Sequence, residues 1–200
     1  MVTAEATVEP RPEYPVRLQV EEPATLNRFL WLIKWLLAIP NSFVLGLVGI
    51  VYMFTLFFAW VAVVVTGRYP RGLFNFNVGC LRWTTRLNAY TTGLVTDRYP
   101  PFAMRDIPEY PVRVTVEYPG KMSRLTAFFR YFLALPHLII VWSLNYVWAA
   151  LWLIVGVIIL FTGKYQRDLF KFVVGIMRWN VRASGYLILA TDKSPPFSLE

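Results

Sequence analysis

The chain has 200 residues, of which 56% are hydrophobic and only 16% charged, and its formal net charge is +8. A soluble domain averages about a quarter charged residues, so this composition argues against an ordinary soluble globule and excludes a disordered chain. One cysteine and one histidine exclude an intramolecular disulfide and any Cys-based or multi-His metal site, so we expect no metal and no cofactor.

The N-terminal region does not have the pattern of a targeting segment. Residues 1–15 contain three glutamates and no apolar run, whereas a signal peptide begins with basic residues followed by an apolar stretch. We predict that residues 1–11 form a disordered tail and that membrane insertion depends on internal segments.

The rest of the chain is an internal repeat. Tyr14-Pro15-Val16-Arg17 recurs 96 residues later as Tyr110-Pro111-Val112-Arg113, and Arg82-Trp83 recurs as Arg178-Trp179. Thr-Asp and Pro-Pro-Phe near the end of each unit recur with an offset of 95. We therefore predict two pseudo-symmetric repeats, residues 12–105 and 106–200.

Each repeat opens with a short alternating run, residues 16–21 and 112–117. Alternation with a period of two predicts a half-buried strand. Because a single strand leaves its backbone groups unpaired, we expect the two strands to pair with each other.

A long apolar stretch follows, residues 26–66 and 122–162. Each stretch is long enough for one span plus an interfacial helix, or for a hairpin of two spans, because one span needs about 20 residues. With one span per repeat, the flanking Lys and Arg residues divide equally between the two sides. With two spans, they all lie on one side, which the positive-inside rule favours.

The charge pattern therefore predicts membrane helices at 26–47, 49–66, 122–143 and 145–162, with both termini in the cytoplasm. The hairpins could instead be re-entrant wedges, because Pro40 and Pro136 should kink the first helix of each. Lys34 and Arg130 are expected to reach back to the headgroups.

The third segment of each repeat is amphipathic. Apolar residues recur at steps of three and four from Leu73 to Leu94, and the copy runs from Leu169 to Tyr186. This pattern predicts a helix that lies in the headgroup region or packs on the membrane helices.

Basic and aromatic residues on these helices are the candidate lipid site. We predict that anionic headgroups bind Arg82, Arg86, Arg178, Arg182 and Lys171. The alternative is that the arginines only fix topology or pair with Asp97, Asp168 and Asp192. Trp83 and Trp179 are predicted to be interfacial anchors.

The sequence contains no recognisable catalytic constellation, so we expect no enzymatic activity. Neither apolar stretch contains Asp or Glu, and phosphate-binding and nucleophile-elbow motifs are missing. His137 occupies the position of Asn41 in the other repeat. These two residues are the candidates for a pathway at the repeat interface.

The recurring Tyr-Pro-Val-Arg, Thr-Gly, Leu-Phe, Arg-Trp-x-x-Arg and Pro-Pro-Phe motifs resemble an uncharacterised bacterial membrane family, domain of unknown function 4389, in two tandem copies. The resemblance implies a bacterial membrane protein, which we expect in the inner (plasma) membrane. It implies no activity, substrate or catalytic residue.

Together these patterns predict an all-α integral membrane protein with a small β element. Each repeat is expected to consist of a strand, a membrane helical hairpin and an amphipathic interfacial helix. The leading functional hypothesis is a non-enzymatic accessory or scaffold subunit, or a lipid-interacting protein that shapes the membrane. Its expected partners are the bilayer, anionic lipids and a membrane complex or second copy, but not nucleic acid. The alternatives are a small transporter or channel and, less favoured, a lipid-modifying enzyme that depends on His137.

Overall fold

The computed structural model describes residues 14–199, so the predicted tail at residues 1–11 lies outside the described residues. In chain order the elements are β1 (Val16–Val20), α1 (Leu30–Leu37), α2 (Ile39–Thr66), α3 (Arg71–Thr91), β2 (Val112–Val116), α4 (Arg124–Thr162) and α5 (Arg167–Leu187). A strand, a long helical segment and a shorter helix therefore follow each other twice, once in each half of the chain.

The two strands form an antiparallel pair, which confirms the pairing that the alternating runs predict. Val16 lies opposite Val116, and Leu18 lies opposite Val114. Val16 and Leu18 are buried on the inner side of the sheet, while Gln19 is exposed on the other side. Apolar residues thus hold the sheet against the helices, and polar residues face outward.

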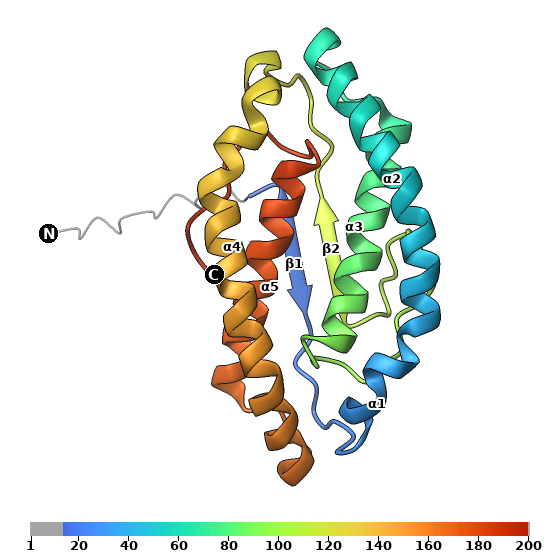
Figure 1. Ribbon diagram of the computed structural model, residues 1–200, viewed down its shortest axis with the longest axis vertical. Helices are drawn as coiled ribbons and strands as arrows, with labels where there is room; N and C mark the ends of the chain where they lie inside the picture. The colour runs from blue at the N-terminus through green and yellow to red at the C-terminus, as the bar shows by residue number, and fades with distance from the viewer. Residues whose placement is uncertain (1–13, 200) are drawn as a thin grey trace, which may run out of the picture.

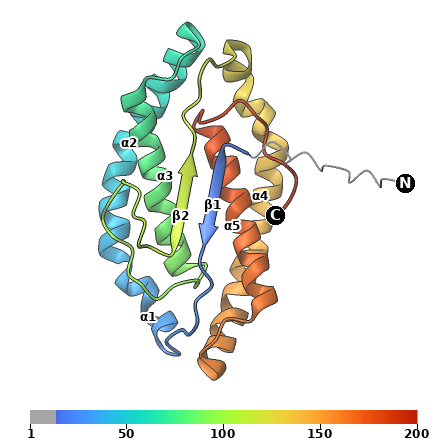
Figure 2. The same ribbon diagram turned by 180° about the vertical axis from the view of Figure 1, so that it is seen from behind.

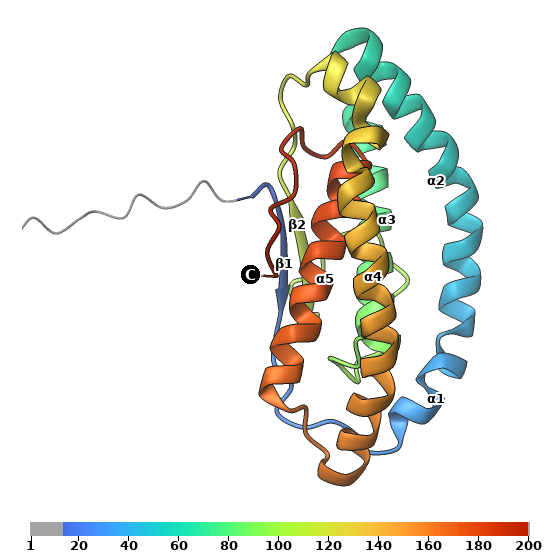
Figure 3. The same cartoon turned by 60° about the vertical axis from the view of Figure 1, so that its left-hand side comes forward.

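The elements form three layers. The sheet is the first layer, α3 and α5 form the second, and α2 and α4 form the third (Figures 2 and 3). Within this arrangement β1 packs against α5 and β2 packs against α3, so each repeat places its strand on the third-segment helix of the other. α2 and α4 run in opposite directions along the long axis (Figure 1).

The predicted membrane hairpins are wrong, because α2 and α4 are single helices of 28 and 39 residues. No turn occurs near Gly49 or Asn145. Ser143 donates from its hydroxyl to the Ile139 carbonyl of its own helix, at 3.0 Å. A continuous helix satisfies its backbone groups internally, whereas a turn in an apolar environment would leave several unpaired.

The break in the first apolar stretch lies earlier, beside a proline. α1 ends at Leu37 and α2 begins at Ile39, with Pro40 in its first turn, where a missing N–H costs little. Pro136 lies inside α4, which continues through it. The two prolines therefore occupy different positions in their helices despite the sequence repeat.

In the outer helical layer, the helices of the two repeats contact each other at two places with the same arrangement. At one end Trp60 of α2 packs on α4 and donates from Nε1 to the Ala127 carbonyl at 3.0 Å. At the other end Trp31 of α1 packs on Gly156 of α4, where a Cβ would lie 2.6 Å from Trp31 Cε3. Positions 31 and 127 are equivalent in the repeat, as are 60 and 156. Each contact thus pairs one tryptophan with one small residue, with the roles exchanged.

Candidate functional site: an apolar helix face with basic ends

One broad face of the molecule consists of apolar side chains that no other part of the described chain covers. Met53, Phe132 and Phe161 are 72%, 72% and 74% exposed, and many Phe, Leu, Ile and Val residues of α1, α2 and α4 accompany them. α2 contains no charged residue. Soluble proteins rarely expose such a large continuous apolar patch, so this face requires an apolar partner.

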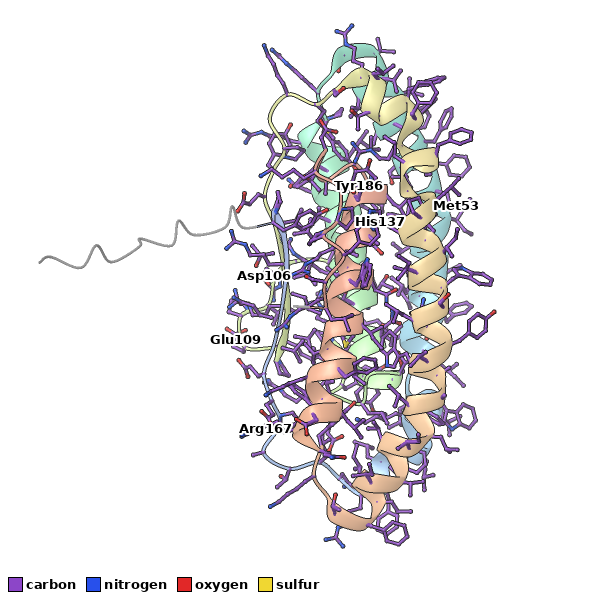
Figure 4. The ribbon with its side chains drawn as sticks, turned by 90° about the vertical axis from the view of Figure 1, so that its left-hand side faces the viewer. Met53, Asp106, Glu109, His137, Arg167 and Tyr186 are labelled. Carbon is purple, nitrogen blue, oxygen red and sulfur yellow. The ribbon has the colours of Figure 1, made fainter. Side chains whose placement is uncertain are left out.

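The opposite face carries charged groups. Arg17 pairs with Glu117, and Arg113 pairs with Asp106, each at 3.0 Å, on or beside the outer side of the sheet. Figure 4 shows Met53 on one side of the molecule and Asp106 and Glu109 on the other. The three layers therefore have one apolar side and one charged side.

Lys34 is buried rather than directed toward headgroups, which corrects the prediction from the sequence. Its side chain is 2% exposed, and its ammonium lies 2.8 Å from Asp97 Oδ1 and donates to the Thr96 carbonyl at 2.7 Å. The ammonium also lies 4.9 Å from the ring centre of Tyr90. The other oxygen of Asp97 accepts from the Asn27 backbone N–H.

Arg130 repeats this arrangement in the second half. It is fully buried, pairs with Asp192 and donates to the carbonyls of Tyr186 and Thr191. Asp192 Oδ2 accepts from the Ser123 backbone N–H at 2.8 Å. In each repeat the Thr-Asp motif therefore holds a buried cation and the chain that precedes the long helix.

Of the four arginines predicted to bind headgroups, Arg86 is buried and the other three are half-buried. Arg82 Nε donates to the Val114 carbonyl at 3.0 Å, and Arg86, 3% exposed, donates to the Ala103 carbonyl. Arg182 donates to the Ser198 carbonyl at 3.4 Å. Burial lowers the pKa values of Arg86 and Arg182 from their ordinary value. The buried guanidinium of Arg86 offers little to a headgroup, and Arg86 and Arg182 each bond to a carbonyl directly after a Pro-Pro-Phe segment.

Two further residues complete the predicted headgroup site. Arg178 is half-buried and Lys171 is exposed. Headgroup binding by these two side chains, and by the half-buried Arg82 and Arg182, remains a prediction.

Trp83 and Trp179 also differ from the interfacial position predicted for them. Both are buried, and Trp83 Nε1 donates to Asn41 Oδ1 at 2.7 Å. Trp179 lies against Phe197, with 6.0 Å between ring centres. The outer helical layer covers the faces of α3 and α5 that carry these two tryptophans.

Asn41 and His137 are engaged within their own repeats. Asn41 Nδ2 donates to the Pro100 carbonyl at 2.8 Å. His137 Nε2 is 2.9 Å from Ser194 Oγ, and its ring stacks on Phe197 at 4.3 Å. The structure therefore does not bring these two residues together at the repeat interface.

Basic residues gather at the ends of the apolar face; the sequence analysis treats them only as flanking charges that determine topology, not as a site. Where α2 ends and α4 begins, Arg68, Lys121 and Arg124 surround a hollow of about 400 Å³. At the opposite end Arg28 lies against Gly163, beside the exposed Lys164. The available signal was the Thr-Gly motif, which places a basic residue directly after each long apolar stretch.

The described residues, 14–199, contain no group of three or more His, Cys, Asp or Glu side chains that could hold a metal ion. The single cysteine, Cys80, is buried, and burial raises the pKa of its thiol to about 11. Its thiol is therefore protonated at neutral pH.

Fold and surface together define a tandem-repeat helical protein with two apolar segments, Leu30–Thr66 and Arg124–Thr162. Both are long and apolar enough to cross a membrane, by length and composition. The model of a domain of unknown function, DUF4389, matches residues 28–104 and 124–198. The chain therefore belongs to this family and carries two tandem copies of its domain. No characterised protein and no solved structure matches the chain.

Proposed function

We propose that this protein is a non-enzymatic membrane protein of the bacterial plasma membrane. In this proposal it embeds the layer formed by α1, α2 and α4 in one leaflet and thereby shapes the bilayer or supports a membrane complex. The observation that carries the proposal is the separation of an uncovered apolar helix face from a charged sheet face.

The dimensions of the helices favour an orientation along the membrane plane. At 1.5 Å per residue, α4 is about 58 Å long, nearly twice the roughly 30 Å of a hydrocarbon core. The sheet runs beside the helices along the same axis (Figure 1). A spanning orientation would bring Arg113 and Asp106 to bilayer depth, where charged groups cost at least about 2.5–3.5 kcal/mol each.

The basic ends of the apolar face support an interaction with anionic lipids. With the long helices in the membrane plane, Arg68, Lys121 and Arg124 lie beside the edge of the embedded layer, at the level of the headgroups. Each such cation contributes about 1 kcal/mol near an anionic leaflet. The chain's excess of basic residues supports a location on the cytoplasmic side, with residues 14 and 199 on that side.

The alternative of a transporter or channel draws no support from Asn41 and His137, because each is hydrogen-bonded inside its own repeat. A membrane partner or a second copy covering part of the apolar face remains compatible with the scaffold role.

Vesicle flotation combined with electron microscopy tests this proposal. We expect purified protein to float with phosphatidylcholine vesicles, to float better when phosphatidylglycerol is added, and to change vesicle shape. The paired substitutions Met53→Glu and Phe57→Glu should abolish flotation, since each removes about 1.5–3 kcal/mol of apolar burial and adds a charge.

Thr115→Glu, on the exposed side of the sheet, adds the same type of charge and serves as the matched control. Equal flotation of the apolar-face variant and this control contradicts the proposed membrane face. Flotation without any effect of phosphatidylglycerol or any change in vesicle shape contradicts the lipid-interacting role.

A further inference from the structure

A cavity lined by carboxamide and aromatic side chains interrupts the contact between the two repeats. Its volume is about 430 Å³. The side chains that line it come from three helices and one helix end: Asn88 from α3, Thr92 directly after α3, Asn145, Trp148 and Trp152 from α4, and Asn180 from α5. None of these side chains is charged.

The cavity opens on the apolar face. Asn145 is exposed, and it also lines a neighbouring hollow with Trp142 and Tyr146 on the outer side of α4. These two aromatic residues are 66% and 67% exposed. A molecule in the cavity can therefore continue directly onto the apolar surface of α4.

The lining offers hydrogen bonds to an uncharged group. Asn180 Nδ2 donates to Asn145 Oδ1 at 3.1 Å, which orients the two carboxamides. Trp148 is 8% exposed, and its indole N–H has no hydrogen-bond partner within residues 14–199. A ligand in the cavity does not reach that N–H, so the carboxamides of the lining are the groups available to it, and their N–H donors suit an oxygen acceptor.

The two repeats differ in the side chains at this site. The positions equivalent to Asn145 and Trp148 are Gly49 and Tyr52. The positions equivalent to Asn88 and Asn180 are Ser184 and Thr84, so the three carboxamides occur on one side of the molecule only. Asn145 is therefore a difference between the repeats that calls for an explanation beyond packing.

We propose that this cavity binds the head of a neutral lipid of the diacylglycerol class. Its hydroxyl and ester oxygens meet the carboxamides of Asn88 and Asn145, and its acyl chains extend from the cavity along the apolar face into the bilayer. The inference rests on the proposed membrane face, because the chains need the bilayer to enter. A phosphate would gain no cation here, so the site selects against charged headgroups.

Photolabelling in vesicles tests this site. The probe is diacylglycerol with a diazirine in one acyl chain, present in phosphatidylcholine vesicles that carry the full-length protein. We expect the doubly substituted variant Asn88→Leu/Asn145→Leu to capture roughly tenfold less probe, because two hydrogen-bonding side chains are lost. Ser143→Leu is the matched control, since Ser143 is exposed on α4, lies outside the cavity and bonds only to its own helix. It should capture as much probe as the wild type.

The same vesicles are also floated on a density gradient, which separates two kinds of failure. Flotation with undiminished capture by the double variant refutes the cavity site alone. Equal capture of a phosphatidylcholine probe with the same diazirine chain also refutes it, because the site would then not distinguish headgroups. Failure to float refutes the membrane face and the cavity site together.

Discussion

Because Trp31 packs tightly on Gly156, we predict that Gly156→Ala is neutral or destabilising in the wild type but stabilising in a Trp31→Ala background. A Cβ at position 156 would lie 2.6 Å from Trp31 Cε3, well inside van der Waals contact. Overpacking of this kind costs about 1–3 kcal/mol. Alanine also gains about 1 kcal/mol over glycine in a helix, so Gly156→Ala should be neutral to destabilising by about 2 kcal/mol.

Trp31→Ala removes the clash, so that Gly156→Ala then contributes only the higher helix propensity of alanine. The substitution alone should cost about 3–5 kcal/mol, because Trp31 is buried and packs edge-on against Trp152 at 5.5 Å. In that background Gly156→Ala should stabilise the protein by about 1 kcal/mol. The coupling free energy between the two positions is then about 1–3 kcal/mol, as expected for side chains in contact.

Thermal unfolding in mild detergent, followed by circular dichroism, measures this coupling. For a chain of this length 1 kcal/mol corresponds to about 2–4 °C in Tm. Gly46→Ala is the matched control, since no atom lies within 4 Å of a Cβ at that position of α2, and it should have the same effect in both backgrounds. Gly156→Ala that stabilises the wild type and the Trp31→Ala background equally would refute the tight contact.

Four further predictions concern buried groups. Asp192→Ala leaves the buried Arg130 without its anionic partner and should lower the free energy of unfolding by about 3 kcal/mol or more; an unchanged Tm would contradict this. Because burial raises the pKa of Cys80 to about 11, its thiol should resist alkylation at pH 8 until the protein unfolds, and rapid labelling of folded protein would count against its burial. The same raised pKa favours the folded state fully below the thiol's ordinary pKa of 9.0, and this contribution should disappear as the pH rises through about 11. Tyr165→Phe removes the hydroxyl that donates to the Gly93 carbonyl at 3.0 Å and should cost about 1 kcal/mol, measurable by the same unfolding assay; no loss would show that this bond between the repeats contributes nothing.

The regular parts of the fold could be predicted from local patterns. The alternating runs predict β1 and β2 and, because a lone strand cannot stand, their pairing. The three-and-four spacing after Leu73 and Leu169 predicts α3 and α5. These signals are local, so they do not depend on how the layers assemble.

The hairpin prediction is wrong because the placement of charges does not by itself show how often the chain crosses a membrane. All flanking cations lie on one side of a membrane in a four-span protein, but they do so equally when two long helices lie along the membrane plane. The charge count alone does not separate these arrangements. The sheet is what distinguishes the two arrangements, because its charged residues lie alongside α2 and α4 and would enter the bilayer if these helices crossed it.

The burial of Lys34 and Arg130 could not be predicted from the sequence around each residue. Lys34 and Arg130 lie near the start of apolar stretches, a position that normally indicates contact with headgroups. The Thr-Asp motif that pairs with each cation lies about 60 residues later. The motif recurs in both repeats, but nothing in the local sequence connects it with the cation that it binds.

The depth of α2 in the bilayer tests the central claim most directly. Spin labels are placed singly at positions 43, 53 and 65 of a Cys80→Ala variant, since Phe43, Met53 and Val65 are at least 63% exposed on the outer side of α2. Power-saturation electron paramagnetic resonance in phosphatidylcholine–phosphatidylglycerol vesicles then gives the depth of each label. With α2 along the membrane plane, all three labels reside in the same leaflet. Labels at 43 and 65 in opposite leaflets, with 53 near the bilayer centre, would show that the helix crosses the membrane and would contradict the account.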